Sequence, residues 1–121
     1  MAKTVKITAD NGISIIDIPW NLKNFEDAIG AECIESVKTQ RMYDLFGTMI
    51  VLIVDESDHV GKRQENRAAS YLYGIDRHGY AIAGDVIFGL MEGPEILPPE
   101  NPESLMQFLI RKFPYLQGDV S

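Results

Sequence analysis

Apolar and polar residues follow two different periods in the first thirty positions. Residues 3–8 alternate between apolar and polar side chains, which predicts a half-exposed strand. The Asp-Asn-Gly triplet at 10–12 is typical of a tight reversal, because asparagine and glycine tolerate a positive φ. Residues 13–18 are again rich in isoleucine, so we expect an N-terminal β-hairpin.

Three stretches have the 3.6-residue period of an amphipathic helix, over residues 22–29, 67–73 and 103–113. An asparagine that can cap the first turn stands shortly before each of them. Gly30 and Gly74 follow the first two as left-handed terminators, and Pro102 suits the first turn of the third. We expect the third helix to cover its own sheet rather than that of a neighbouring subunit.

The stretch 48–55 holds six consecutive apolar residues, 49–54, and predicts a central strand buried on both faces. Residues 31–38 predict extended structure, and residues 84–92 predict the last strand, with Gly89 marking a bulge or a close approach. Residues 42–46 fit either a continuation of the preceding strand or the approach to the central one.

The predicted fold is a single α+β domain over residues 1–121. It has a mixed, mainly antiparallel sheet of four or five strands with two or three packed helices. The Pro-rich residues 93–102 are expected to form an extended connector, residues 75–83 a loop, and residues 103–113 the C-terminal helix.

Composition and charge narrow the classes of function. The net charge of −7 argues against nucleic-acid binding by general electrostatics, since phosphate contacts need surplus lysine and arginine. Solubility explains most of the acidity, and a basic partner is the second interpretation. No apolar run is long enough for a membrane helix. The chain has a single cysteine and no signal-peptide pattern, so we expect a cytoplasmic protein.

The order and spacing of several short motifs resemble a family of unknown function, DUF3846, over roughly residues 15–92. The matching features are Ile29-Gly30, Cys33-Ile34-Glu35, Val54-Asp55-Glu56, Asn66-x-x-Ala69-Ser70 and Ile82-x-Gly84-Asp85-Val86-Ile87-Phe88. The sequence departs from the family pattern at Ala31-Glu32. The resemblance implies a small accessory protein of bacteria, phages or plasmids and brings no catalytic residues.

The sequence gives little support for catalysis. Nucleotide-binding fingerprints, a Walker motif and a nucleophile elbow are absent. Cys33 is expected to be a buried structural thiol. The acidic residues 55–59 fail the EF-hand template, since Val60 replaces its glycine, and we interpret them as a solvated turn. We therefore predict no enzyme activity, no cofactor and no metal site.

A basic and aromatic segment after this turn is the best candidate for binding. Its candidate residues are Lys62, Arg63, Asn66, Arg67, Ser70 and Tyr71. Arginine at a helix start could hold an anion, and tyrosine could stack on a base. The competing interpretation is that the arginines pair with nearby carboxylates and the tyrosines pack on the sheet.

We expect a non-catalytic accessory protein of a phage or mobile element that binds a host protein. The alternative is a protein that binds or sequesters a small anionic nucleotide-type ligand. Exposed sheet edges and the terminal helix also suggest a homodimer.

Overall fold

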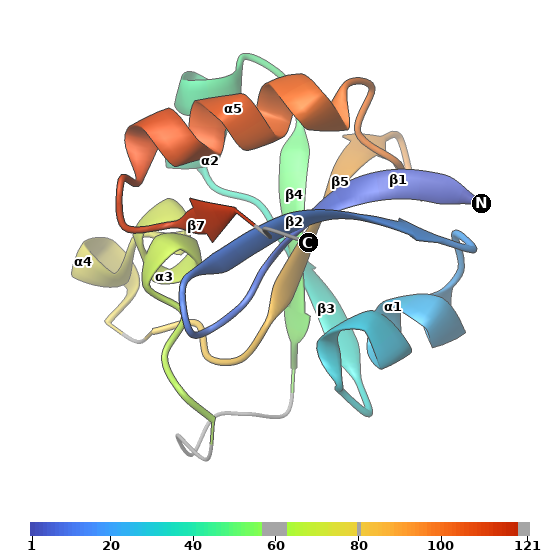
Figure 1. Cartoon of the computed structure of the whole chain (residues 1–121), viewed down its shortest axis with the longest axis horizontal. Coiled ribbons are helices and arrows are strands. Elements are labelled where there is room, and N and C mark those ends of the chain that lie inside the picture. Colours follow the sequence, from blue (N-terminus) through green and yellow to red (C-terminus); the bar gives the residue numbers. More distant parts are fainter. Residues whose placement is uncertain (57–62, 80, 119–121) are drawn as a thin grey trace.

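The computed structural model describes residues 1–56, 63–79 and 81–118, and its centre is a twisted, open sheet (Figure 1). The described residues form seven strands, β1 (Ala2–Ile7), β2 (Gly12–Ile18), β3 (Ile34–Val37), β4 (Ile50–Asp55), β5 (Val86–Glu92), β6 (Glu95–Leu97) and β7 (Gln117–Gly118). Their order is β3-β4-β5-β1-β2-β7, and β6 pairs with β5. Neighbours are antiparallel except β2 and β7, which are parallel. The α+β class is confirmed, but the predictions of four or five strands and of two or three packed helices were both too low.

Helices cover both faces of the sheet (Figure 1). One face packs against α1 (Leu22–Ile29), and the other against α2 (Gln40–Phe46), α3 (Arg67–Tyr73) and α5 (Pro102–Lys112). The short α4 (Ile75–His78) follows α3 directly. No helix in the described residues is long and apolar enough to cross a membrane.

The central strand β4 supplies side chains to both hydrophobic clusters, as its unbroken apolar run predicted. Leu52 and Val54 face the cluster under α2, α3 and α5, while Ile53 joins Phe25 and Ile29 beneath α1. Successive side chains of a strand point to opposite faces, so a strand buried on both sides must be apolar throughout.

Asparagine caps determine where three of the helices begin. The side chains of Asn21, Asn66 and Asn101 accept hydrogen bonds from backbone N–H groups three residues further on, at 3.0–3.1 Å. Each bond satisfies one of the N–H groups that a first turn leaves without a partner. The predicted starts of α1, α3 and α5 are confirmed. Leu105 and Leu109 of α5 are buried in its own core, as expected.

Three local predictions were wrong. Residues 42–46 lie in α2, because the Thr39 side chain caps its first turn and Gly47 ends it in the left-handed region. Ile75–His78 form α4 rather than loop. Cys33 is exposed in a bend before β3, so it is not a buried core thiol.

The predicted connector contains β6, which folds back on β5. A Cβ atom on Gly89 would lie 2.5 Å from Cγ2 of Ile96, so the close approach expected at this glycine is present. Tertiary packing of this hairpin, rather than local periodicity, makes residues 95–97 a strand.

Candidate functional site

The predicted basic and aromatic segment is divided by α3 into a buried half and an exposed half. Asn66 and Ser70 are four residues apart and face the sheet, where both are buried. Arg67 and Tyr71 follow them by one position and are also four residues apart, so they lie together on a different side of α3, where both are exposed. Lys62, the first candidate residue, lies outside the described residues.

Asn66 uses its side-chain amide within the fold. Its Nδ2 donates to the backbone oxygens of Ile7, at 3.1 Å, and Gly84, at 2.9 Å, while its Oδ1 accepts from Ala69 N–H. One residue thus joins the start of α3 to β1 and to the segment before β5. With three internal bonds on a fully buried side chain, Asn66 is a structural residue.

Ser70 and Arg63 are also engaged in internal contacts. Ser70 Oγ donates to Ile82 O at 3.1 Å and accepts from Ile82 N–H at 2.9 Å. The Arg63 guanidinium donates to the backbone oxygens of Ile29, at 3.1 Å, and Gly30, and its Nε lies 3.4 Å from the Asp55 carboxylate. The Asp55 side chain is only 3 % exposed, so its expected place in a solvated turn was wrong. Residues 57–59 of that predicted turn lie outside the described residues.

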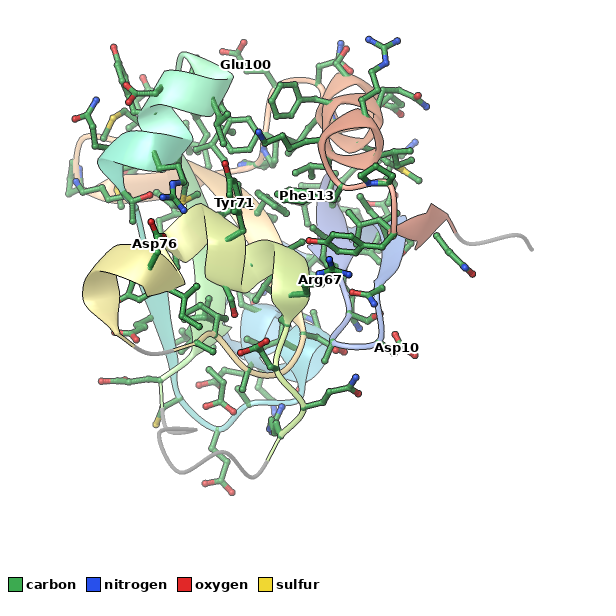
Figure 2. All side chains as sticks on the ribbon, turned by 90° about the vertical axis from the view of Figure 1, so that its left-hand side faces the viewer. Asp10, Arg67, Tyr71, Asp76, Glu100 and Phe113 are labelled. Carbon is green, nitrogen blue, oxygen red and sulfur yellow. The ribbon has the colours of Figure 1, made fainter. Side chains whose placement is uncertain are left out.

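The exposed half of α3 combines with the end of α5 to form a cationic–aromatic face, which we define as Arg67, Tyr71, Lys112 and Tyr115, packed around the buried Phe113. The Arg67 guanidinium carbon lies 3.9 Å from the centre of the Tyr115 ring. Lys112 Nζ lies 5.2 Å from the centre of the Tyr71 ring, and Phe113 contacts both tyrosine rings. Figure 2 shows Arg67 and Tyr71 on α3, with Phe113 beside Tyr71.

Arg41 of α2 borders this face. Its guanidinium carbon is 4.6 Å from the centre of the Tyr71 ring, and its nitrogens donate to Tyr71 O, at 2.8 Å, and to the Asp76 carboxylate, at 3.0 Å. The hydrogen bond that Arg41 donates to the Asp76 carboxylate raises the pKa of Arg41. Because Asp76 balances its charge, Arg41 holds the Tyr71 ring in place and adds little net positive charge to the face.

The two cations of the face itself are not balanced in this way. In the part of the chain that the structure describes, neither Arg67 nor Lys112 has a carboxylate within salt-bridge distance. Burial raises the pKa of the Tyr115 phenol, and the positive charge of Arg67 partly opposes that rise. Tyr115 therefore stays protonated at neutral pH and offers a hydrogen-bond donor beside Arg67.

This arrangement suits binding rather than chemistry. The described residues contain no group of three or more histidine, cysteine, aspartate or glutamate side chains that could hold a metal ion. A hollow of about 420 Å³ lies beside α2, where Thr39, Tyr43 and Met49 line it, but none of its lining residues belongs to the cationic–aromatic face. The face is a surface contact zone of cations on aromatic rings.

Comparison with known proteins identifies no relative: no family model matches the chain, and no curated protein or solved structure matches it. The resemblance to DUF3846 stays a prediction.

Sequence reasoning missed the α5 half of the face. Lys112, Phe113 and Tyr115 are more than 40 positions from Arg67, and only the packing of α5 across β1 and β2 brings them to α3. One local signal was available. Lys112 ends an amphipathic helix, and Phe113 and Tyr115 follow it within three positions, which is a cationic and aromatic pattern of the same kind as Arg67 and Tyr71.

Proposed function

We propose that this chain is a non-catalytic binding protein, and that its cationic–aromatic face contacts an acidic surface of a protein partner. The observation that carries the proposal is the pair Arg67 and Lys112, two exposed cations on tyrosine rings that no described carboxylate pairs with, in a chain of net charge −7. Tyrosine and arginine are enriched among the residues that dominate binding energy at protein interfaces.

Stacking prepares Arg67 for this role. A guanidinium held flat on a ring keeps its N–H groups in the plane of the fork, where they can pair with a carboxylate. Fixing the side chain before binding also lowers the entropy lost on association. The partner therefore needs carboxylates positioned to meet Arg67 and Lys112.

The nucleotide alternative has less support among the described residues. Asn66 and Ser70 make internal hydrogen bonds, and Arg63 joins α1 to β4. The rings of Tyr71 and Tyr115 already lie beside the protein's own cations, which leaves less ring surface for a base. Recognition of carboxylates by the edge of Arg67 is the better fit.

We also propose, on the resemblance to DUF3846 alone, that the partner is a host protein and the chain an accessory protein of a phage or mobile element. This setting agrees with a small binding protein. It is independent of the geometry of the face, so either proposal can fail without the other.

The test is an NMR titration of the chain with a glutamate-rich peptide and, separately, with mono- and cyclic dinucleotides. We expect amide shifts from the acidic peptide around α3 and the end of α5, weakening as salt is added. Arg67→Ala and Lys112→Ala should each weaken binding about tenfold, since one charge-assisted contact contributes about 1.5 kcal/mol. Arg111→Ala is the matched control, because this exposed cation of α5 has no ring contact in the described residues.

If Arg111→Ala weakens binding as much as Arg67→Ala, the interaction is general electrostatics and the proposed site is wrong. If only nucleotides bind, and raise the melting temperature, the nucleotide alternative replaces the proposal.

A further inference from the structure

Among the described residues, β2 is an edge strand over most of its length. On its outer side, β7 pairs only with Gly12 and Ile13. No described strand pairs with the outer side of residues 14–18, and Figure 1 shows β2 continuing past β7. Unpaired backbone groups on a strand edge are a template for another strand.

The register identifies which backbone groups face outward. Thr8 N–H donates to Gly12 O at 2.8 Å, so these two residues form a bonded pair of the β1–β2 ladder. Bonded and non-bonded pairs alternate along an antiparallel ladder. The even-numbered residues of β2 therefore bond to β1, and Ile13, Ile15 and Asp17 direct their N–H and C=O groups outward. Since Ile13 is paired with β7, Ile15 and Asp17 are the outward residues of β2 that no described strand pairs with.

Two copies of β2 can satisfy these groups in one symmetric register. If Ile15 of each copy bonds to Asp17 of the other, both outward residues are used and Ile16 lies opposite its own counterpart. A register with Ile15 opposite Ile15 would bring Asp17 to Ile13, which β7 occupies. A register with Asp17 opposite Asp17 would oppose two carboxylates and bring Ile15 to Pro19, which has no N–H group.

The side chains of β2 also suit a strand neighbour. Ile15 packs beside the larger core and is only half-buried, while Ile16 and Ile18 are half-buried beside the cluster under α1. Asp17 lies cross-strand from Lys3 on β1, and opposite charges at such positions are favourable. An opposing copy would cover the exposed parts of the isoleucines.

The other edge of the sheet is protected against such pairing. Its strand β3 has four residues, and the exposed Glu35 lies in the middle, between Ile34 and Ser36. Glu56 N–H donates to Cys33 O, so by the same alternation Ile34 and Ser36 face outward. Self-pairing of Ile34 with Ser36 would place Glu35 opposite Glu35. Charge in the centre of a short strand is a common way to block edge association.

We propose that the chain forms a two-fold symmetric homodimer through antiparallel pairing of β2 with β2, with Ile16 at the centre. The pairing joins two sheets into one, and its outer edges are the charged β3 strands. Closed symmetry of this kind stops at two copies.

Disulfide cross-linking tests the register in a Cys33→Ser background. At a non-bonded antiparallel pair the two Cα atoms are about 4.5 Å apart, within the disulfide range of about 4.4–6.8 Å. Ile16→Cys should therefore give a reducible covalent dimer on mild oxidation. Ile18→Cys is the matched control, since in this register Ile18 faces Ser14 and its counterpart is about 13 Å away along the strand. Equal cross-linking of both variants, or none with Ile16→Cys, overturns the proposal.

Solution mass tests the dimer without new cysteines. Sedimentation up to about 1 mM should show the 13.6 kDa chain approaching twice that mass. Ile15→Pro removes an outward N–H without removing a bond to β1, and should leave a folded monomer. Ser36→Pro makes the same change at the β3 edge and should leave the dimer intact. A chain that is monomeric throughout, or that dissociates with Ser36→Pro but not Ile15→Pro, contradicts the β2 interface.

Discussion

The two sides of α3 use similar residue types for opposite purposes. Asn66 and Ser70 point into the fold, where their hydrogen-bonding groups join α3 to the strands around it. Arg67 and Tyr71 point outward and meet side chains from α2 and the end of α5. Burial, rather than polarity, separates residues that maintain the fold from residues that can contact a partner. Substitutions on the two sides should therefore affect different measurements.

Asn66→Ala should have the largest effect on stability. It removes the α3 cap and leaves the buried carbonyls of Ile7 and Gly84 without this donor, which we expect to cost about 3 kcal/mol in the free energy of unfolding. Urea denaturation measures the loss. Asn66→Asp is the informative control, since it keeps the capping oxygen but loses both donated bonds, and it should also be destabilised. If Asn66→Ala lowers the free energy of unfolding by less than about 1 kcal/mol, the structural role of Asn66 is wrong.

Arg63→Ala should have the next largest effect, about 2 kcal/mol. It removes the cation beside the nearly buried Asp55 carboxylate and the bonds to the end of α1. Arg63→Lys keeps the charge without the planar fork and should recover part of the loss. Full recovery by lysine would show that charge alone, rather than bonds to two carbonyls, explains the role of Arg63.

Arg67→Ala should leave stability almost unchanged, with a loss of at most about 1 kcal/mol from its ring contact. The same variant is the one expected to weaken binding of an acidic partner. Denaturation and binding measured on one preparation give the sharpest contrast with Asn66→Ala. A large loss of stability would mean that Arg67 belongs to the structural side of α3.

The smallest expected effect is on the titration of Tyr115. Burial raises the pKa of its phenol and Arg67 opposes the rise, so Arg67→Ala should raise that pKa further. Because the pKa of Tyr115 is higher in the folded than in the unfolded protein, its contribution to stability is complete below the unfolded-state pKa of about 10. This contribution is lost as the pH rises from about 10 through the folded-state pKa. Ultraviolet difference titration of wild type and Arg67→Ala measures the shift, with Tyr115→Phe identifying the signal. A shift to lower pH in Arg67→Ala would contradict the contact.

Local sequence signals predicted those helices and strands that are marked in the sequence by a capping residue or by a continuous apolar run. The three asparagine caps and the apolar run of β4 are such signals, and α1, α3 and α5 begin where these predict. The helix α2 was missed because its cap, Thr39, follows an extended segment and the helix has only seven residues. The short strands β6 and β7 depend on β5 and β2, so no local pattern could identify them.

The candidate site was only half predictable for a similar reason. Residue type was enough to select Arg67 and Tyr71 as candidates. It was not enough to tell which candidates lie on the buried side of α3 and which on the exposed side. The contact of Arg67 with Tyr115 spans 48 positions and depends on where α5 ends. Ser70 and Asn66 looked like ligand residues because polar groups that bind the backbone are the same groups that bind ligands.

The position of β1 has a consequence for how the protein is made. This first strand lies between β2, its neighbour in sequence, and β5, which is formed about 80 residues later. The Thr4 hydroxyl donates to Phe88 O at 2.6 Å, across 84 positions. During synthesis the N-terminal hairpin must therefore wait, with one side of β1 unpaired, until most of the chain has emerged. Such long-range pairing slows folding and extends the time during which a nascent chain can associate wrongly.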